Sequence, residues 1–239
     1  MSTTTEQAPP RPSTWAFKVA MALSGSLLVS FLLIHLFGNM KIFTGAEHFD
    51  DYAEWLRVAF VPFLPAGMIL WLFRLVIFSG FAIHIYGGIT IWSRGRKARG
   101  PHRAQAKASR TGFQGFTARL MPVTGVFTLA FVIIHLMDLT LGIKPIASDS
   151  FEHPVGTRPA AYSNVIASFE RPWMAAIYVC MMVLISLHVA HGISTVVQDL
   201  GAMGKRVRMV TAIIAGLAAL AILLGNAAIP LAVQFGVIS

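Results

Sequence analysis

Five histidines lie inside long apolar runs of this 239-residue chain: His35, His84, His135, His188 and His191. An ionisable side chain is costly in an apolar setting, so one found there usually has a function. A neutral imidazole is a good ligand for a transition metal, and it can also relay protons. The other three histidines fall in polar segments, where we expect solvated side chains: His48, His102 and His153.

The composition determines what kind of chain carries these histidines. Hydrophobic residues make up 56% of the chain and charged residues 12%, about half the charged share of a typical soluble domain. Neither a soluble enzyme nor a disordered chain fits this balance. Five apolar runs each reach the ~20 residues that a helix needs to cross ~30 Å of hydrocarbon. They are approximately Val19–Phe37, Gly67–Trp92, Met121–Leu141, Trp173–Val197 and Met209–Val237. The sequence therefore predicts an all-α membrane protein with five transmembrane helices.

Charges in the connections predict the orientation. Thirteen Lys and Arg residues lie on the N-terminal flank and in the connections between spans two and three and between spans four and five, against five in the opposite loops. By the positive-inside rule the N-terminus is cytoplasmic and the C-terminus is outside the plasma membrane. The net charge of +9 then reflects topology and contact with anionic lipid rather than nucleic-acid binding.

Depth along the spans sorts the histidines into two pairs. His35 follows Lys18 by 17 residues and His135 follows Arg119 by 16, which at ~1.5 Å per residue places both ~25 Å from the cytoplasmic end. His84 precedes Arg94 by 10 residues and His188 precedes Gln198 by 10, which places both ~15 Å from that end. Two bis-histidine haems b stacked across a four-helix bundle need this arrangement.

The fourth span leaves the choice of ligand open. His188 and His191 share one helix face, and either could bind iron. His188 matches the depth of His84 better, so His191 is expected nearer the cytoplasm, beside a haem propionate or a quinone oxygen.

Two charges at membrane depth admit two interpretations. Arg74 and Asp138 could pair with each other, or Arg74 could neutralise a propionate of the outer haem or face a quinone.

The pattern resembles the membrane-anchor cytochrome b subunit of succinate:quinone oxidoreductases (succinate dehydrogenase/fumarate reductase), in its single-chain, five-helix, di-haem form. The resemblance rests on His35 with Gly38–Asn39, on His84, on His135 and on the stretch His188-Val-Ala-His191-Gly192. It implies that His35 and His135 ligate the outer haem iron, and that His84 and His188 ligate the inner one.

The resemblance also implies partners. Family members bind a flavoprotein subunit and an iron–sulfur subunit at the cytoplasmic face and pass electrons to menaquinone or another quinone. Succinate oxidation then occurs on a partner, because this chain has a single cysteine and no dinucleotide fingerprint. For the quinone pocket the candidates are Glu54 and Arg57 at the outer side, in the amphipathic stretch Tyr52–Phe63, and His191 at the inner side.

Residues 1–14 are expected to form a short disordered cytoplasmic tail, and residues 15–239 a single transmembrane cytochrome b domain. Two alternatives stay open. One is the cytochrome b of another quinone-linked system, such as a formate dehydrogenase, a hydrogenase or an ascorbate-reducing enzyme. The other is a transporter that uses its histidines as a proton relay.

Overall fold

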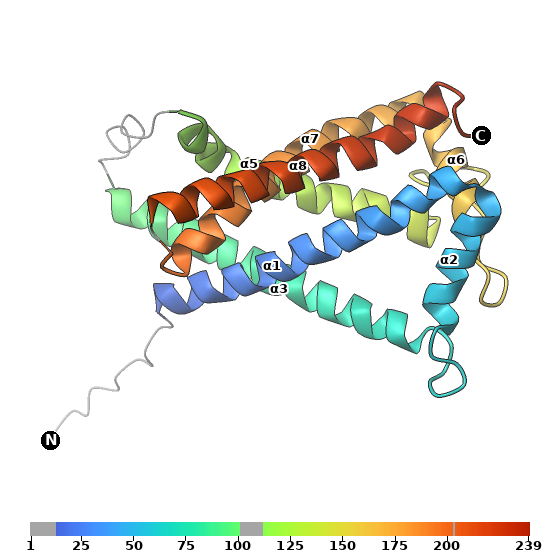
Figure 1. Cartoon of the computed structure of the whole chain (residues 1–239), viewed down its shortest axis with the longest axis horizontal. Helices are drawn as coiled ribbons and strands as arrows, with labels where there is room; N and C mark the ends of the chain where they lie inside the picture. Colours follow the sequence, from blue (N-terminus) through green and yellow to red (C-terminus); the bar gives the residue numbers. More distant parts are fainter. Residues whose placement is uncertain (1–12, 101–111, 203) are drawn as a thin grey trace, which may run out of the picture.

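Long helices dominate the computed structural model, which describes residues 13–100, 112–202 and 204–239. Within these ranges five helices are long and apolar enough to cross a membrane, so the prediction of an all-α, multi-pass membrane protein is confirmed. They run side by side as an elongated bundle (Figure 1). These helices are α1 (Thr14–Asn39), α3 (Met68–Arg99), α5 (Gly112–Leu136), α7 (Pro172–Asp199) and α8 (Lys205–Gln234).

Shorter helical pieces connect the spans: η1 (Met40–Thr44), α2 (Ala46–Val58), η3 (Met137–Leu141) and α6 (Ala161–Phe169). The expected amphipathic stretch is α2, which begins and ends several residues earlier than predicted. Helix α6 was not expected from the sequence. Both α2 and α6 lie at the end of the bundle that also holds the C-terminus (Figure 1).

Local chemistry explains where several helices begin. The Ser13 hydroxyl caps α1 by accepting a hydrogen bond from the amide of Ala16 at 3.2 Å. Pro172 occupies the first turn of α7, where its missing N–H costs nothing. Gly45 (φ 103°) and Gly67 (φ 80°) precede α2 and α3 in backbone conformations that L side chains rarely adopt.

Helix α7 forms the centre of the bundle and packs along α8, α5 and α1. Its buried side chains recur at helical spacing: Met174, Tyr178, Met181, Met182, Ile185 and Val189. Helix α3 packs mainly on α1 and touches α2, and it has no extensive packing contact with α5 or α7. Large apolar side chains such as Phe37 and Leu217 are exposed along the spans, as expected for surfaces that face lipid.

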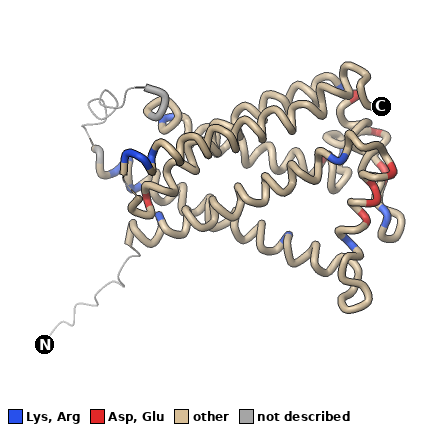
Figure 2. Tube along the Cα trace, viewed as in Figure 1, with Lys and Arg blue, Asp and Glu red and all other residues tan. Residues whose placement is uncertain are grey.

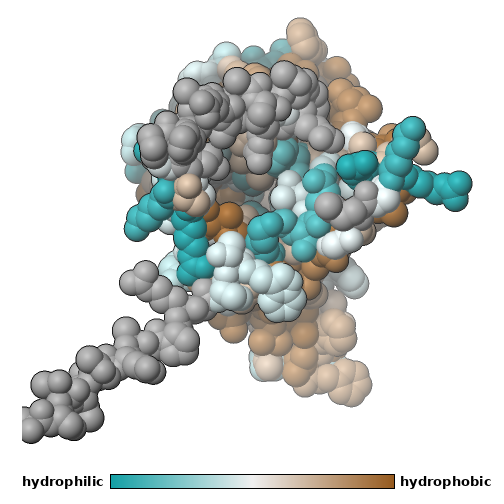
Figure 3. All heavy atoms as spheres, turned by 90° about the vertical axis from the view of Figure 1, so that its left-hand side faces the viewer, coloured by the Kyte–Doolittle hydropathy of each residue, from teal (hydrophilic) through white to brown (hydrophobic). Residues whose placement is uncertain are grey.

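Charged residues separate between the two ends of the bundle. Figure 2 shows that Lys and Arg gather at the end where α1 begins, whereas Asp and Glu lie mostly at the end with α2 and α6. Viewed from the basic end, hydrophilic side chains occupy much of the face and apolar ones surround it (Figure 3). We call these the basic end and the acidic end.

Part of the sequence prediction lies outside the described residues. This holds for most of the predicted tail 1–14, for His102, and for four of the charges counted above: Arg11, Arg103, Lys107 and Arg110.

Candidate functional site

The histidines of the first and third spans lie together near the acidic end. The ring centres of His35 on α1 and His135 on α5 are 6.0 Å apart, and their planes are 80° to each other. Each ring stacks on the phenylalanine four residues before it, Phe31 at 5.4 Å and Phe131 at 5.9 Å. We call His35 and His135 the outer pair.

The histidines of α3 and α7 form a second pair with the same spacing. The ring centres of His84 and His188 are 6.3 Å apart, and the planes are 66° to each other. We call these two residues the inner pair. The structure thus joins the spans in the combination that the depths predicted, first with third and second with fourth.

Neighbouring hydroxyl groups hold the inner rings. Ser24 Oγ lies 3.4 Å from Nδ1 of His84, and Thr124 Oγ1 lies 3.0 Å from Nδ1 of His188. Both hydroxyls donate their own proton to a carbonyl one turn back, at Ala20 and Leu120. They therefore accept from an Nδ1–H group, which leaves the Nε2 lone pair of each ring for another partner.

Glycines make room beside the same rings. A Cβ atom at Gly25 would lie 3.1 Å from Cε1 of His84, and one at Gly125 would lie 3.5 Å from Cε1 of His188. Any side chain at Gly25 would crowd the ring or the space in front of it.

These residues belong to an internal repeat that sequence analysis did not identify. Ser24, Gly25, Phe31 and His35 recur 100 positions later as Thr124, Gly125, Phe131 and His135. Helices α1 and α5 thus each place a hydroxyl and a glycine beside one inner ring, and they pair their own histidines with each other. The repeated spacing was the signal that could have singled out the two hydroxyl residues.

His191 lies outside both pairs. Its Nδ1 is 2.9 Å from the hydroxyl oxygen of Thr117 on α5, a side chain that is itself buried. Because His191 is one turn further along α7 than His188, it lies on the basic-end side of the inner pair.

Asp138 does not pair with Arg74, so that interpretation of the two charges is wrong. Asp138 is fully buried in the π-helical turn η3 and accepts a hydrogen bond from Arg171 at 2.7 Å on Oδ1. Ser168 and Tyr178 donate to its other oxygen at 2.5 and 3.0 Å. Sequence analysis missed this partner because Arg171 is 33 residues away and was counted only as an outer-loop charge.

Arg74 instead lies over the ring of Trp71 on its own helix, 4.7 Å from the ring centre. The positive charge of Arg74 also acts on the guanidinium of Arg57 on α2. Burial lowers the pKa of Arg57 and the charge of Arg74 lowers it further, while the carboxylate of Glu54 raises it. Glu54 and Arg74, the other two predicted outer residues, are thus the charges that act on Arg57.

Partners within the protein already occupy part of this outer group. Glu54 accepts a hydrogen bond from Thr157 at 2.7 Å and lies 3.8 Å from Arg158. The Arg57 guanidinium donates to the carbonyl of Ala53 at 2.6 Å.

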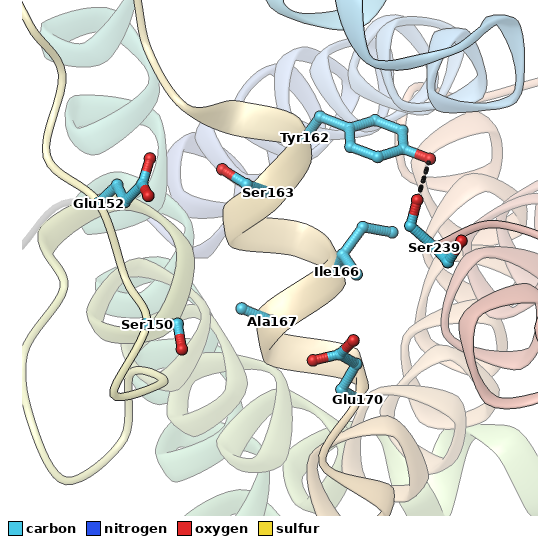
Figure 4. A pocket seen from close by; sticks show the side chains of 8 residues that line it. All are labelled: Ser150, Glu152, Tyr162, Ser163, Ile166, Ala167, Glu170 and Ser239. Carbon is cyan, nitrogen blue, oxygen red and sulfur yellow. Dashed lines mark hydrogen bonds between the residues drawn. The ribbon is translucent and has the colours of Figure 1, made fainter.

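A pocket of about 360 Å³ opens at the acidic end, between α6, the segment near Ser150 and the last residue, Ser239. Figure 4 shows the carboxylates of Glu152 and Glu170 on its rim and the Tyr162 hydroxyl bonded to Ser239. None of the histidines that the structure describes lines it.

Comparison with known proteins gives one result. The family model described as succinate dehydrogenase/fumarate reductase transmembrane subunit matches residues 93–225, more than half of the chain. The matched segment contains His135, His188 and His191, while His35 and His84 precede it. Searches of curated proteins and of solved structures give no match.

The buried ion pair gives a stability prediction. Arg171→Gln leaves the Asp138 carboxylate buried without its cation, so we expect a loss of about 3–5 kcal/mol, read as a lower thermal midpoint in detergent. Asp138→Asn should cost less, because the Arg171 side chain is 20% exposed and can turn toward solvent. The double variant Asp138→Asn/Arg171→Gln should lose less than Arg171→Gln alone. An equal loss in the single and double variants would show that the ion pair is not the cause.

Proposed function

The chain belongs to the family of succinate dehydrogenase/fumarate reductase transmembrane subunits, and we propose that it is the haem-carrying anchor that passes electrons from an iron–sulfur partner to quinone. The observation that carries this proposal is the spacing of the two histidine pairs. A transition-metal ion lies about 2 Å from each ligating imidazole nitrogen, so two axial imidazoles have ring centres roughly 6 Å apart. The observed separations are 6.0 and 6.3 Å.

The rest of the surroundings also fit a flat macrocycle. Gly25 and Gly125 leave space beside the inner rings, and α3 has no extensive packing contact with α5. Among the described residues no cluster of three or more His, Cys, Asp or Glu side chains could hold a metal. Each pair offers two ligands only, so a porphyrin would have to supply the other four, as it does in a bis-histidine haem.

In this proposal His35 and His135 ligate the outer haem, and His84 and His188 ligate the inner haem. His188 is preferred to His191 because its ring is the one that faces His84. His191, held by Thr117, is then a hydrogen-bond partner for an inner propionate or quinone oxygen. A bound haem supplies reversible one-electron transfer, and the protein sets its potential through the ligands and the hydrogen bonds behind them.

Arg74 is proposed to face the outer haem or a quinone. On α3 it stands ten residues before His84, and on α7 Tyr178 stands ten residues before His188. Tyr178 reaches the outer ligand His135, with its hydroxyl 3.4 Å from Nδ1. The equal spacing on α3 and α7 therefore predicts that Arg74 lies in the matching position on the other side of the outer pair.

The quinone, menaquinone or another, is proposed to bind near the outer group of Glu54 and Arg57 or near His191. Quinone reduction takes up protons, and ionisable side chains are present at both places: Glu54 and Arg57 on α2 at the acidic end, and His191 on the basic-end side of the inner pair. The hydrogen bonds that Glu54 and Arg57 already make favour a role in shaping the outer pocket over direct proton donation.

Partner subunits would bind the basic end. The positive charge gathered there predicts that this end faces the cytoplasm across the plasma membrane. The chain has one cysteine, Cys180, and cannot hold a cysteine-ligated iron–sulfur cluster itself. Residues 15–239 would thus act as one cytochrome b domain, while a flavoprotein oxidises succinate and an iron–sulfur subunit delivers the electrons.

Purification of the tagged chain from its native membrane tests the partner assignment. We expect a flavoprotein and an iron–sulfur protein to copurify and succinate to reduce the haems b of the complex. Copurification with a molybdenum or nickel–iron enzyme instead would assign the chain to another quinone-linked dehydrogenase.

Single substitutions test the ligands by haem content. His35→Ala and His135→Ala should each lose the outer haem and keep the inner one, so the haem content per chain falls by half, and His84→Ala and His188→Ala should do the reverse. His191→Ala should keep both haems, as should His153→Ala, a control at the acidic end. Loss of a haem in His191→Ala but not in His188→Ala would reverse the assignment of the fourth ligand.

A further inference from the structure

A chain of hydrogen bonds connects the outer pair to a buried carboxylate. Asp138 accepts from Arg171 on one oxygen and from Ser168 and Tyr178 on the other. The Tyr178 hydroxyl lies 3.0 Å from this carboxylate and 3.4 Å from Nδ1 of His135. Tyr178 thus stands between the anion and the ring.

The direction of these bonds follows from their chemistry. The ionised carboxylate, paired with Arg171, can only accept, so Tyr178 donates its single proton to Asp138. The phenolic oxygen is then left as an acceptor, and the His135 ring donates to it from Nδ1–H. The bonds run from His135 to Tyr178 to Asp138, and Nε2 of His135 keeps its lone pair.

In the part of the chain that the structure describes, the inner pair has no such anion next to its Nδ1 atoms. His84 and His188 donate to the neutral hydroxyls of Ser24 and Thr124, and these hydroxyls pass the hydrogen bond to backbone carbonyls. No acidic side chain contacts either ring among the interactions of the described residues. The two pairs therefore differ in whether a charged group stands at the end of the hydrogen bond from Nδ1, although the spacing of their rings is nearly the same.

We propose that Tyr178 and Asp138 are positioning residues that hold His135 by a hydrogen-bonded relay and make the outer pair more electron-donating than the inner pair. This inference rests on the proposed function, since it assumes that His135 ligates an iron. When the group that accepts the Nδ1–H hydrogen bond is itself bonded to an anion, it draws the ring proton toward itself. The imidazole becomes more electron-rich, and Nε2 becomes a stronger electron-pair donor to a metal. A stronger donor stabilises ferric over ferrous iron, which lowers the midpoint potential of that haem.

The structure also explains why the relay stays in place. Arg171 donates to Asp138 and to the carbonyl of Ile146, and it lies over the ring of Trp173. The Tyr178 ring packs edge-on against Phe131 and Phe169 at 4.9 and 4.7 Å. The carboxylate and the phenol are thereby fixed before any group binds to His135.

Redox titration of the purified holoprotein tests the relay, with each haem followed by its absorbance. Tyr178→Phe removes the acceptor hydroxyl and keeps the ring packing. We expect it to retain both haems, to shift the outer midpoint to more positive potential and to leave the inner one unchanged. At a fixed ambient potential the ratio of reduced to oxidised outer haem should rise several-fold. Asp138→Asn should shift it in the same direction.

Thr124→Val is the matched control, because it removes the corresponding hydroxyl behind His188 in the inner pair. It should move the inner potential and leave the outer one in place. Unchanged potentials in Tyr178→Phe with both haems present would overturn the relay and leave the proposed function intact. Absence of haem b from the unsubstituted protein would instead overturn the proposed function itself.

Discussion

An imidazole buried in an apolar span needs a partner for each of its two nitrogens, and the architecture of this protein is built around that requirement. Hydroxyl groups on neighbouring helices bind Nδ1 in three of the four paired rings. The opposite ring nitrogens remain for the iron that we propose between the two rings, whose centres lie about 6 Å apart. The two pairs join α1 with α5 and α3 with α7, so the packing of the helices sets the geometry of the site.

The repeat between α1 and α5 explains how one chain makes two similar sites. Each of these helices carries a hydroxyl–glycine pair for the inner ring and a phenylalanine–histidine pair for the outer one. The two halves then diverge after the outer histidine. Helix α1 continues to Gly38, whereas α5 enters the π-helical turn that buries Asp138, and π-helical turns inside helices are frequent at functional sites. Similar spacing within the two imidazole pairs thus comes with different electrostatics.

Much of this arrangement follows from the sequence because few alternatives exist in a membrane. Five apolar runs had to be helices, and counting residues from the basic flanks predicted the pairs His35 with His135 and His84 with His188.

The partner of Asp138 could not be predicted in this way. Arg171 reaches Asp138 because the connection between η3 and α7 folds back over the acidic end. The path of such a loop cannot be predicted from the hydrophobic periodicity of the sequence. Helix α6 was missed for a similar reason, since nine residues packed against η3 and α7 show no spanning pattern.

The central claim is that the two imidazole pairs each hold one iron porphyrin. The most direct measurement is the ratio of haem, determined as pyridine haemochrome, to protein in the purified chain. The low-temperature electron paramagnetic resonance spectrum of the oxidised form then reports the spin state and the axial ligands. We expect two haems b per chain, both low-spin with two nitrogen ligands. A colourless chain, or one that holds a single haem when fully loaded, would contradict it.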